Sequence, residues 1–154
     1  MTNRQESAGA RIVPALFYDD PAAALDWLEK AFGFETSICL RDNGKVAHAE
    51  MECGNGRIMI GGTDWAPFPA SPHSLGGKNT QSVHVQVPDV NGHYERARDA
   101  GAQIVAEPTD QFYGDRIYRA VDPEGHHWVF HQPLREVSFA EMEKATGLTV
   151  TGKA

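Results

Sequence analysis

The segment DDPAAALDWLEKAFGFE, residues 19–35, carries the signals of a complete helix. Asp20 is a typical capping residue, Pro21 fits the first helical position, and Gly33 is typical of a helix end. Between these signals one apolar face repeats at helical spacing and comprises Ala24, Leu25, Leu28, Ala31 and Phe32. The segment therefore predicts one amphipathic helix.

A second segment, PDVNGHYERARDAGAQ at residues 88–103, repeats this arrangement. Its apolar face comprises Val90, Tyr94 and Ala97. The matching signals keep nearly one offset: 69 residues from Asp20 to Asp89, 68 from Gly33 to Gly101, and 69 from Gly56 to Gly125. Any α+β protein places capping and turn residues at loosely similar intervals, but three offsets within one residue of each other favour a duplicated module.

Strand-like segments surround both helices in the same order. The first half places them at residues 12–18, 34–41, 46–53 and 57–61, and the second half at 82–87, 103–106, 116–121 and 127–132. This order predicts an α+β fold of two tandem βαβββ modules. Each module offers a curved sheet that needs a second layer, so the halves are expected to pack on each other or on a second chain.

The domain division follows from this order. We expect a flexible N-terminus at 1–11, a first module at 12–62, a Pro/Gly-rich loop at 63–81, a second module at 82–133, and a C-terminal helix and tail at 134–154. The long loop is either a lid that contacts a ligand through Trp65 and Phe68 or a passive linker whose aromatic side chains fill a gap in the core. Ser138 and Glu141 suit a capping box, so a short helix that packs on the body should end near Gly147.

Composition narrows the classes of partner. The 154 residues carry a net charge of −7 without a local basic patch, so neither nucleic acid nor an anionic membrane surface is an expected partner. The apolar runs are too short to cross a bilayer, and the N-terminus lacks the apolar stretch of a secretory signal. Cys39 and Cys53 lie in apolar segments and fit free, buried thiols, which favours the cytoplasm.

Local motifs add a family resemblance. The two modules close their helices with AFGFE and DAGAQ, and the chain also contains His48-Ala-Glu-Met51, Tyr113-Gly-Asp-Arg116 and the hairpin Asp122-Pro-Glu-Gly-His-His-Trp128. From about Ile12 to Pro133 the chain resembles the vicinal-oxygen-chelate superfamily of glyoxalases, bleomycin-resistance proteins and dioxygenases, in particular its PhnB-like or bleomycin-resistance-like branch. The resemblance implies curved sheets around a cleft, a small-molecule ligand and a homodimer.

Metal-dependent relatives hold a divalent cation on the first and last strands of their modules. The resemblance puts the corresponding positions at Val13, about Ile60, Ser82 and Val129, and none of these side chains is a good metal ligand. We therefore predict no metal site of the usual kind and no cofactor. A divalent metal held by a rearranged set, His84, His131 and Glu50, stays an open alternative.

Strand alternation selects the residues expected to line the cleft. Glu50 and His84 are the candidate catalytic residues, and the candidate ligand-binding residues are Phe17, His48, Trp65, Gln86, Tyr113, Arg116 and His131. Each has a structural alternative: a hydrogen-bonded strand histidine, a solvated carboxylate, a local ion pair for Arg116, and rim packing for the aromatic side chains. His126 and His127 follow a turn and are expected to be exposed.

Three functions remain open at this point. The first is a homodimeric protein that holds a small aromatic or heterocyclic compound, as bleomycin-resistance proteins sequester their drug without chemistry. The second is a lyase, isomerase or dioxygenase that uses a rearranged metal site or acid–base catalysis by Glu50 and His84. The third is an accessory domain, which would have no enclosed cavity.

Overall fold

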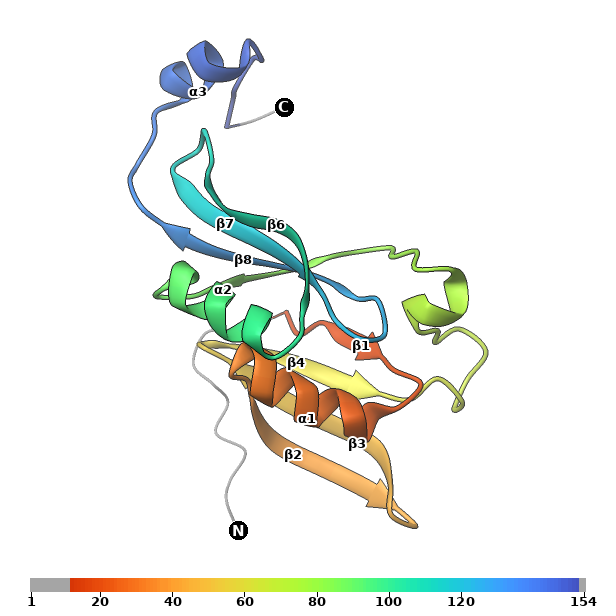
Figure 1. The fold of residues 1–154 in the computed structure, drawn as a ribbon. Helices are drawn as coiled ribbons and strands as arrows, with labels where there is room; N and C mark the ends of the chain where they lie inside the picture. The colour runs from red at the N-terminus through yellow and green to blue at the C-terminus, as the bar shows by residue number, and fades with distance from the viewer. Residues whose placement is uncertain (1–11, 153–154) are drawn as a thin grey trace.

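The computed structural model describes residues 12–152 and contains two mixed four-stranded sheets with three α-helices (Figure 1). The flexible N-terminus expected at 1–11 lies outside the described residues. The first module comprises β1 (Ala15–Phe17), α1 (Pro21–Phe32), β2 (Glu35–Asp42), β3 (Lys45–Cys53) and β4 (Gly56–Gly61). The second comprises β5 (Val83–Gln86), α2 (Val90–Asp99), β6 (Gln103–Asp110), β7 (Asp115–Val121) and β8 (His127–Pro133). A 3-10 turn (Pro72–Leu75) lies in the connecting loop, and α3 (Phe139–Thr146) follows the second module.

The two sheets have the same strand order, which confirms the predicted pair of βαβββ modules. Sheet A runs β1-β4-β3-β2 and sheet B runs β5-β8-β7-β6, with the first strand of each module parallel to the last. The helix signals act as predicted: the Asp20 side chain accepts a hydrogen bond from Ala23 N, and Gly33 adopts a left-handed conformation with φ 70°. The strand predicted at 103–106 is longer than expected and continues to Asp110.

One core joins the two modules on the side that carries α1 and α2 (Figure 1). Phe32 from the first module packs against Trp128 and Phe130 from the second, with ring centroids 5.5 and 4.6 Å apart. All three side chains are almost fully buried. This shared aromatic core leaves the opposite face of each sheet without a helix over it.

A polar latch also holds the modules together. The Asp122 carboxylate, which is 4% exposed, accepts hydrogen bonds from Tyr18 Oη at 2.7 Å and from Trp128 Nε1 at 3.1 Å. Its other oxygen accepts from the backbone amides of Glu124 and His126. The His126 ring contacts the Tyr18 ring and bonds to Phe17 O at 2.7 Å, so the expectation that His126 is exposed is wrong. The β7–β8 turn of the second module is thus hydrogen-bonded to Phe17 and Tyr18 of the first module, just before α1 begins.

The second helix caps the end of the first. Arg96 donates to the carbonyl oxygens of Glu29 and Lys30 at 3.0 and 2.9 Å, in the last turn of α1, and Glu29 O also accepts from the Gly33 amide. His93 Nε2 lies 2.9 Å from Phe32 O, and His93 Nδ1 lies 2.6 Å from Tyr118 Oη. Burial raises the pKa of Tyr118, which keeps its hydroxyl protonated as a donor. Both nitrogens of His93 are therefore used by the neutral ring.

This arrangement predicts a pH dependence of stability. Burial and the nearby Arg96 charge lower the pKa of His93, so the unfolded state binds a proton first as pH falls through about 6.5. We expect the free energy of unfolding to decrease from that pH downward, by at most about 1.4 kcal/mol per pH unit for this group, until the folded-state pKa is passed. Urea unfolding of wild type and His93→Gln between pH 7.5 and 5 measures the difference, and equal slopes in the two proteins would disprove it.

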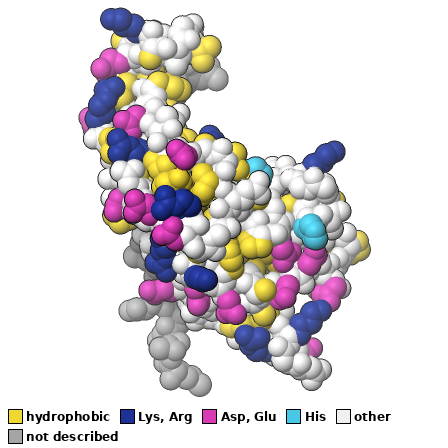
Figure 2. Space-filling view, viewed as in Figure 1, with side chains coloured by type: hydrophobic (Ala, Val, Ile, Leu, Met, Phe, Trp, Pro, Cys, Tyr) yellow, Lys and Arg dark blue, Asp and Glu magenta, His cyan; other side chains and the backbone are white. Residues whose placement is uncertain are grey.

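The C-terminal arm, residues 134–152, stands clear of the body (Figures 1 and 2). Its helix α3 has the predicted capping box between Ser138 and Glu141 and ends at Gly147. None of its residues is buried, so the expectation that it packs on the body is wrong. Gly114, at φ 100°, lies where the arm leaves the second sheet. Its carbonyl oxygen accepts hydrogen bonds from the amides of Leu134 and Arg135, and a Cβ at this position would lie 2.1 Å from Arg135 O.

Candidate functional site on the open sheet faces

One face of each sheet points away from α1 and α2, and no described helix covers it (Figure 1). We call these surfaces open face A, on the sheet of β1–β4, and open face B, on the sheet of β5–β8. Backbone register assigns the side chains, because residues paired across neighbouring strands share a face. Open face A includes Ala15, Phe17, Ile38, Leu40, His48, Glu50, Glu52, Arg57, Met59 and Gly61. Open face B includes His84, Gln86, Asp115, Ile117, Arg119, Val121, His127, Val129 and His131.

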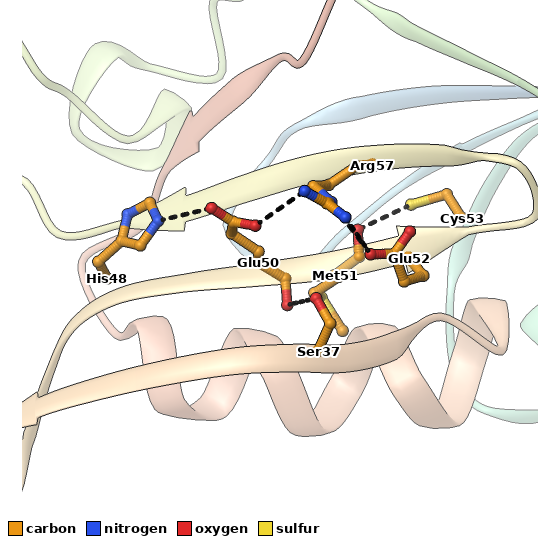
Figure 3. Close-up of polar contacts among 7 residues, drawn as sticks. All are labelled: Ser37, His48, Glu50, Met51, Glu52, Cys53 and Arg57. Atoms are coloured by element: carbon orange, nitrogen blue, oxygen red, sulfur yellow. Dashed lines mark hydrogen bonds and ion pairs between the residues drawn. The ribbon is translucent and has the colours of Figure 1, made fainter. Parts of the chain in front are cut away.

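A chain of charged contacts crosses open face A along β3 and β4 (Figure 3). Glu50 lies between His48 and Arg57, with His48 Nε2 3.5 Å from one carboxylate oxygen and Arg57 Nη1 3.4 Å from the other. Arg57 also donates to Glu52 Oε1 through Nε and Nη2, both at 3.0 Å. Glu50 is 2% exposed although no helix covers this face, so the neighbouring side chains bury its carboxylate. A buried carboxylate needs such partners because desolvation disfavours its charge.

Aromatic side chains lie at one end of the same face. Phe17 on β1 contacts Trp65 and Phe68 of the connecting loop, with ring centroids 6.1 and 5.8 Å apart, and those two rings meet edge to face at 5.0 Å. Trp65 and Phe68 are still 59% and 68% exposed. Gly61 pairs with both Phe17 and His48 across the sheet, so the aromatic cluster adjoins the charged chain. Open face A thus combines an apolar contact surface with fixed charges.

Open face B carries imidazole and guanidinium groups. His131 Nδ1 lies 3.0 Å from Asp115 Oδ2, and His84 Nε2 lies 3.2 Å from Ser82 Oγ. Partial burial lowers the pKa of His84, and the charges of Arg119 and His131 lower it further. A neutral His84 is suited to accept a proton or a hydrogen bond near neutral pH.

A cavity lies where the β3–β4 hairpin of the first module adjoins β5 of the second. It has a volume of about 220 Å³ and is lined by residues from both modules, including Pro14, Cys53, Arg57, Val83, His84 and Gln86. Arg57 of face A and His84 of face B therefore border one depression. Cys53 is buried, which with the Glu52 charge raises its thiol pKa to about 12, whereas Cys39 is exposed, contrary to the expectation of two buried thiols.

Known proteins identify the family. Residues 11–130 match the family model of the Glyoxalase/Bleomycin resistance protein/Dioxygenase superfamily. The chain belongs to this superfamily. An uncharacterized protein of Mycobacterium bovis is 37% identical over 138 residues, covering 86% of this chain and 89% of that protein. An uncharacterized protein of Mycobacterium tuberculosis is also 37% identical over 138 residues, covering 86% and 79%.

Two solved structures of the superfamily are informative. TioX from Micromonospora sp. ML1 is 37% identical, with a TM-score of 0.68, and the match covers 82% of this chain and all of TioX. The fosfomycin resistance protein FosX from Listeria monocytogenes, solved with Mn(II) and sulfate, is 16% identical with a TM-score of 0.61, covering 89% of this chain and 97% of FosX. The likeness to FosX is one of fold. No described helix is long and apolar enough to span a bilayer.

The side chains at the superfamily's metal positions do not fit a divalent cation. Val129 lies on open face B, but Ile60 is fully buried in the core, so placing the position at about Ile60 is wrong. Met59 pairs with Glu50 as Val129 pairs with Arg119, and it is the equivalent residue. Thioether and aliphatic groups are poor ligands for Mg²⁺, Mn²⁺ or Zn²⁺.

The rearranged metal set is not assembled either. Glu50 lies on sheet A, whereas His84 and His131 lie on sheet B, and no group of three His, Cys, Asp or Glu residues suited to a metal occurs within residues 12–152.

The structure separates the other candidate residues into groups. Phe17, His48, Trp65 and Glu50 gather at open face A, and His84, Gln86 and His131 at open face B. Tyr113 lies apart, at the β6–β7 turn against Phe112. Arg116 pairs in register with Gln132, whose side chain binds Val90 N at the start of α2, so Arg116 lies on the helix face.

The charged neighbours of Arg116 and Asp115 come from adjoining strands. Arg116 forms a local ion pair, with its Nε 2.6 Å from Asp110 Oδ1. Asp115 binds His131 across β7 and β8. Sequence reasoning missed Arg57 and Arg119 as members of the site, although Arg57 follows the Gly54-Asn55-Gly56 turn and a tight hairpin places it opposite Glu52.

Proposed function

We propose that the protein binds a small aromatic compound in a cleft bounded by open face A of one copy and open face B of a second, and holds it without chemical conversion. The observation that carries the proposal is the exposed Phe17–Trp65–Phe68 cluster beside the ordered Glu50–Arg57 pair. Ligand pockets commonly combine apolar walls with a few fixed polar groups. On this proposal the aromatic rings contact the ligand and the charges orient it.

Charge complementarity supports a second copy as the other wall of the cleft. By the same register, open face A carries four carboxylates, Glu35, Asp42, Glu50 and Glu52, against Arg57 and Lys45. Open face B carries Arg119 and several histidines against Asp115. Sedimentation at micromolar concentration should therefore give a dimer, and a single species of 16.9 kDa would remove this part of the proposal. We also infer a cytoplasmic location, from the free cysteines.

A thermal-shift screen of aromatic and heterocyclic compounds tests the binding function, because a compound that binds the native state raises its melting temperature. For any hit, Trp65→Ala should weaken binding at least about ten-fold, since a buried aromatic contact contributes on the order of 1–3 kcal/mol. Phe139→Ala is the matched control, because that ring is exposed on α3, away from both open faces. Equal losses in the two variants would count against binding at open face A.

A second candidate function is acid–base catalysis by Glu50 and His84. The lowered pKa of His84 favours it, because that ring is neutral and able to accept a proton at neutral pH. Turnover of a bound compound, lost in His84→Gln with binding retained, would establish catalysis. Metal analysis of untagged protein separates the metal-dependent version: one divalent ion per chain, lost in His84→Ala, would replace the binding-only proposal.

A further inference from the structure

Three groups with positive charge or donor capacity converge on open face B. His84, Val129 and Arg119 form one row across β5, β8 and β7, and His131 lies on β8 two residues from Val129. Neighbouring strands are roughly 4.8 Å apart, so the flanking side chains of that row stand about 10 Å apart on either side of Val129. Val129 is only 2% exposed, whereas His84 and Arg119 are exposed, which places the flanking side chains over it.

These groups keep unused hydrogen-bonding capacity. Arg119 makes no ion pair with any residue between 12 and 152. His84 Nε2 is hydrogen-bonded to Ser82 Oγ, and His131 Nδ1 is hydrogen-bonded to Asp115 Oδ2. The other nitrogen of each ring, His84 Nδ1 or His131 Nε2, makes no hydrogen bond to the described residues. Asp115 is the one carboxylate beside them, and Gln86, paired with His131, adds a neutral amide.

The charge at this place contrasts with the rest of the chain. The protein has a net charge of −7, yet the centre of open face B places the Arg119 guanidinium, which has no ion pair within residues 12–152, beside two imidazoles. Partial burial lowers the pKa of His84, and the nearby charges of Arg119 and His131 lower it further. A bound anion would offset these positive charges and accept hydrogen bonds from the same groups.

We propose that open face B holds an oxyanion, the carboxylate, phosphonate or phosphate group of the ligand, between Arg119, His84 and His131. The inference rests on the proposed binding function and specifies the ligand as an anionic aromatic compound. Arg119 supplies a fork of N–H donors, and His84 donates through Nδ1–H when Ser82 donates to its Nε2. His131, whose Nδ1–H donates to Asp115, donates to the anion through Nε2 in its protonated form. The aromatic part of the ligand would then contact the Phe17–Trp65–Phe68 cluster of the second copy.

Inorganic phosphate is the probe, titrated at constant ionic strength and pH 7 while the imidazole resonances are followed by NMR. The expected result is saturable shifts at His84 and His131 with no comparable shift at His73, which is exposed in the connecting loop. Arg119→Gln should weaken phosphate binding at least ten-fold. Arg98→Gln, which removes an exposed arginine paired with Asp99 on α2, should leave it unchanged.

Each outcome decides the inference. Shifts that do not saturate, that appear equally at His73, or that survive in Arg119→Gln would overturn it, and equal melting temperatures of the two variants would exclude misfolding as the cause. The test is separate from that of the proposed function. Phosphate binding without any aromatic ligand would uphold the anion site alone, whereas Trp65-dependent aromatic binding without phosphate binding would uphold the function and reject the anion site.

Discussion

Asp122→Ala is expected to lower the free energy of unfolding by at least about 3 kcal/mol. The change leaves four donors without their acceptor: Tyr18 Oη, Trp128 Nε1 and the amides of Glu124 and His126. Hydrogen bonds to charged groups contribute about 1.5–3 kcal/mol each, and a buried donor left unpaired loses its hydration as well. Urea unfolding followed by tryptophan fluorescence measures the loss.

Tyr18→Phe is the matched control for this prediction. It removes one donor and keeps the ring against His126, so its effect should be smaller than that of Asp122→Ala. In the Asp122→Ala background, Tyr18→Phe should cost little or nothing, because the acceptor is already gone. Additive effects of the two substitutions would mean that the hydroxyl and the carboxylate do not act as one pair.

Arg57→Met is expected to destabilise the protein by about 3 kcal/mol, the lower end of the range for removing one partner of a buried ion pair. Arg57 has a side chain 14% exposed and lies 3.4 Å from Glu50, which is 2% exposed, so the substitution removes a cation from beside a buried carboxylate that also contacts His48. Methionine keeps most of the side-chain volume, which limits the change to the charge. Thermal or urea unfolding at pH 7 provides the measurement.

The double variant Glu50→Gln/Arg57→Met tests the cause. Removing both charges removes the uncompensated carboxylate, so the double variant should be more stable than Arg57→Met alone. If the double variant is as unstable as the single one, packing of the arginine stem rather than its charge stabilises open face A. The same two variants also test how a ligand is held. They change the charges of open face A and leave Phe17, Trp65 and Phe68 in place, so any loss of ligand binding would come from the charges rather than from the aromatic cluster.

Register explains why one metal position was misplaced. The turns that precede the last strands differ by one residue, since four residues separate the paired Glu52 and Arg57 while five separate the paired Val121 and His127. The constant offset from Gly56 to Gly125 hides this extra residue. A shift of one residue turns every side chain of a strand to the other face, so Met59 rather than Ile60 takes the place equivalent to Val129.

Local patterns in the chain were enough to predict the duplicated βαβββ order, the N-caps of all three helices and the alternation that groups His48 with Glu50 and His84 with Gln86. These features depend on neighbours a few residues apart, and local geometry decides them. Three features could not be predicted in this way: the pairing of Asp115 with His131, the hydrogen bond from His126 to Phe17 O, and the absence of buried residues from α3. Those contacts join segments up to 109 residues apart, and their partners depend on strand register and on how the two modules pack.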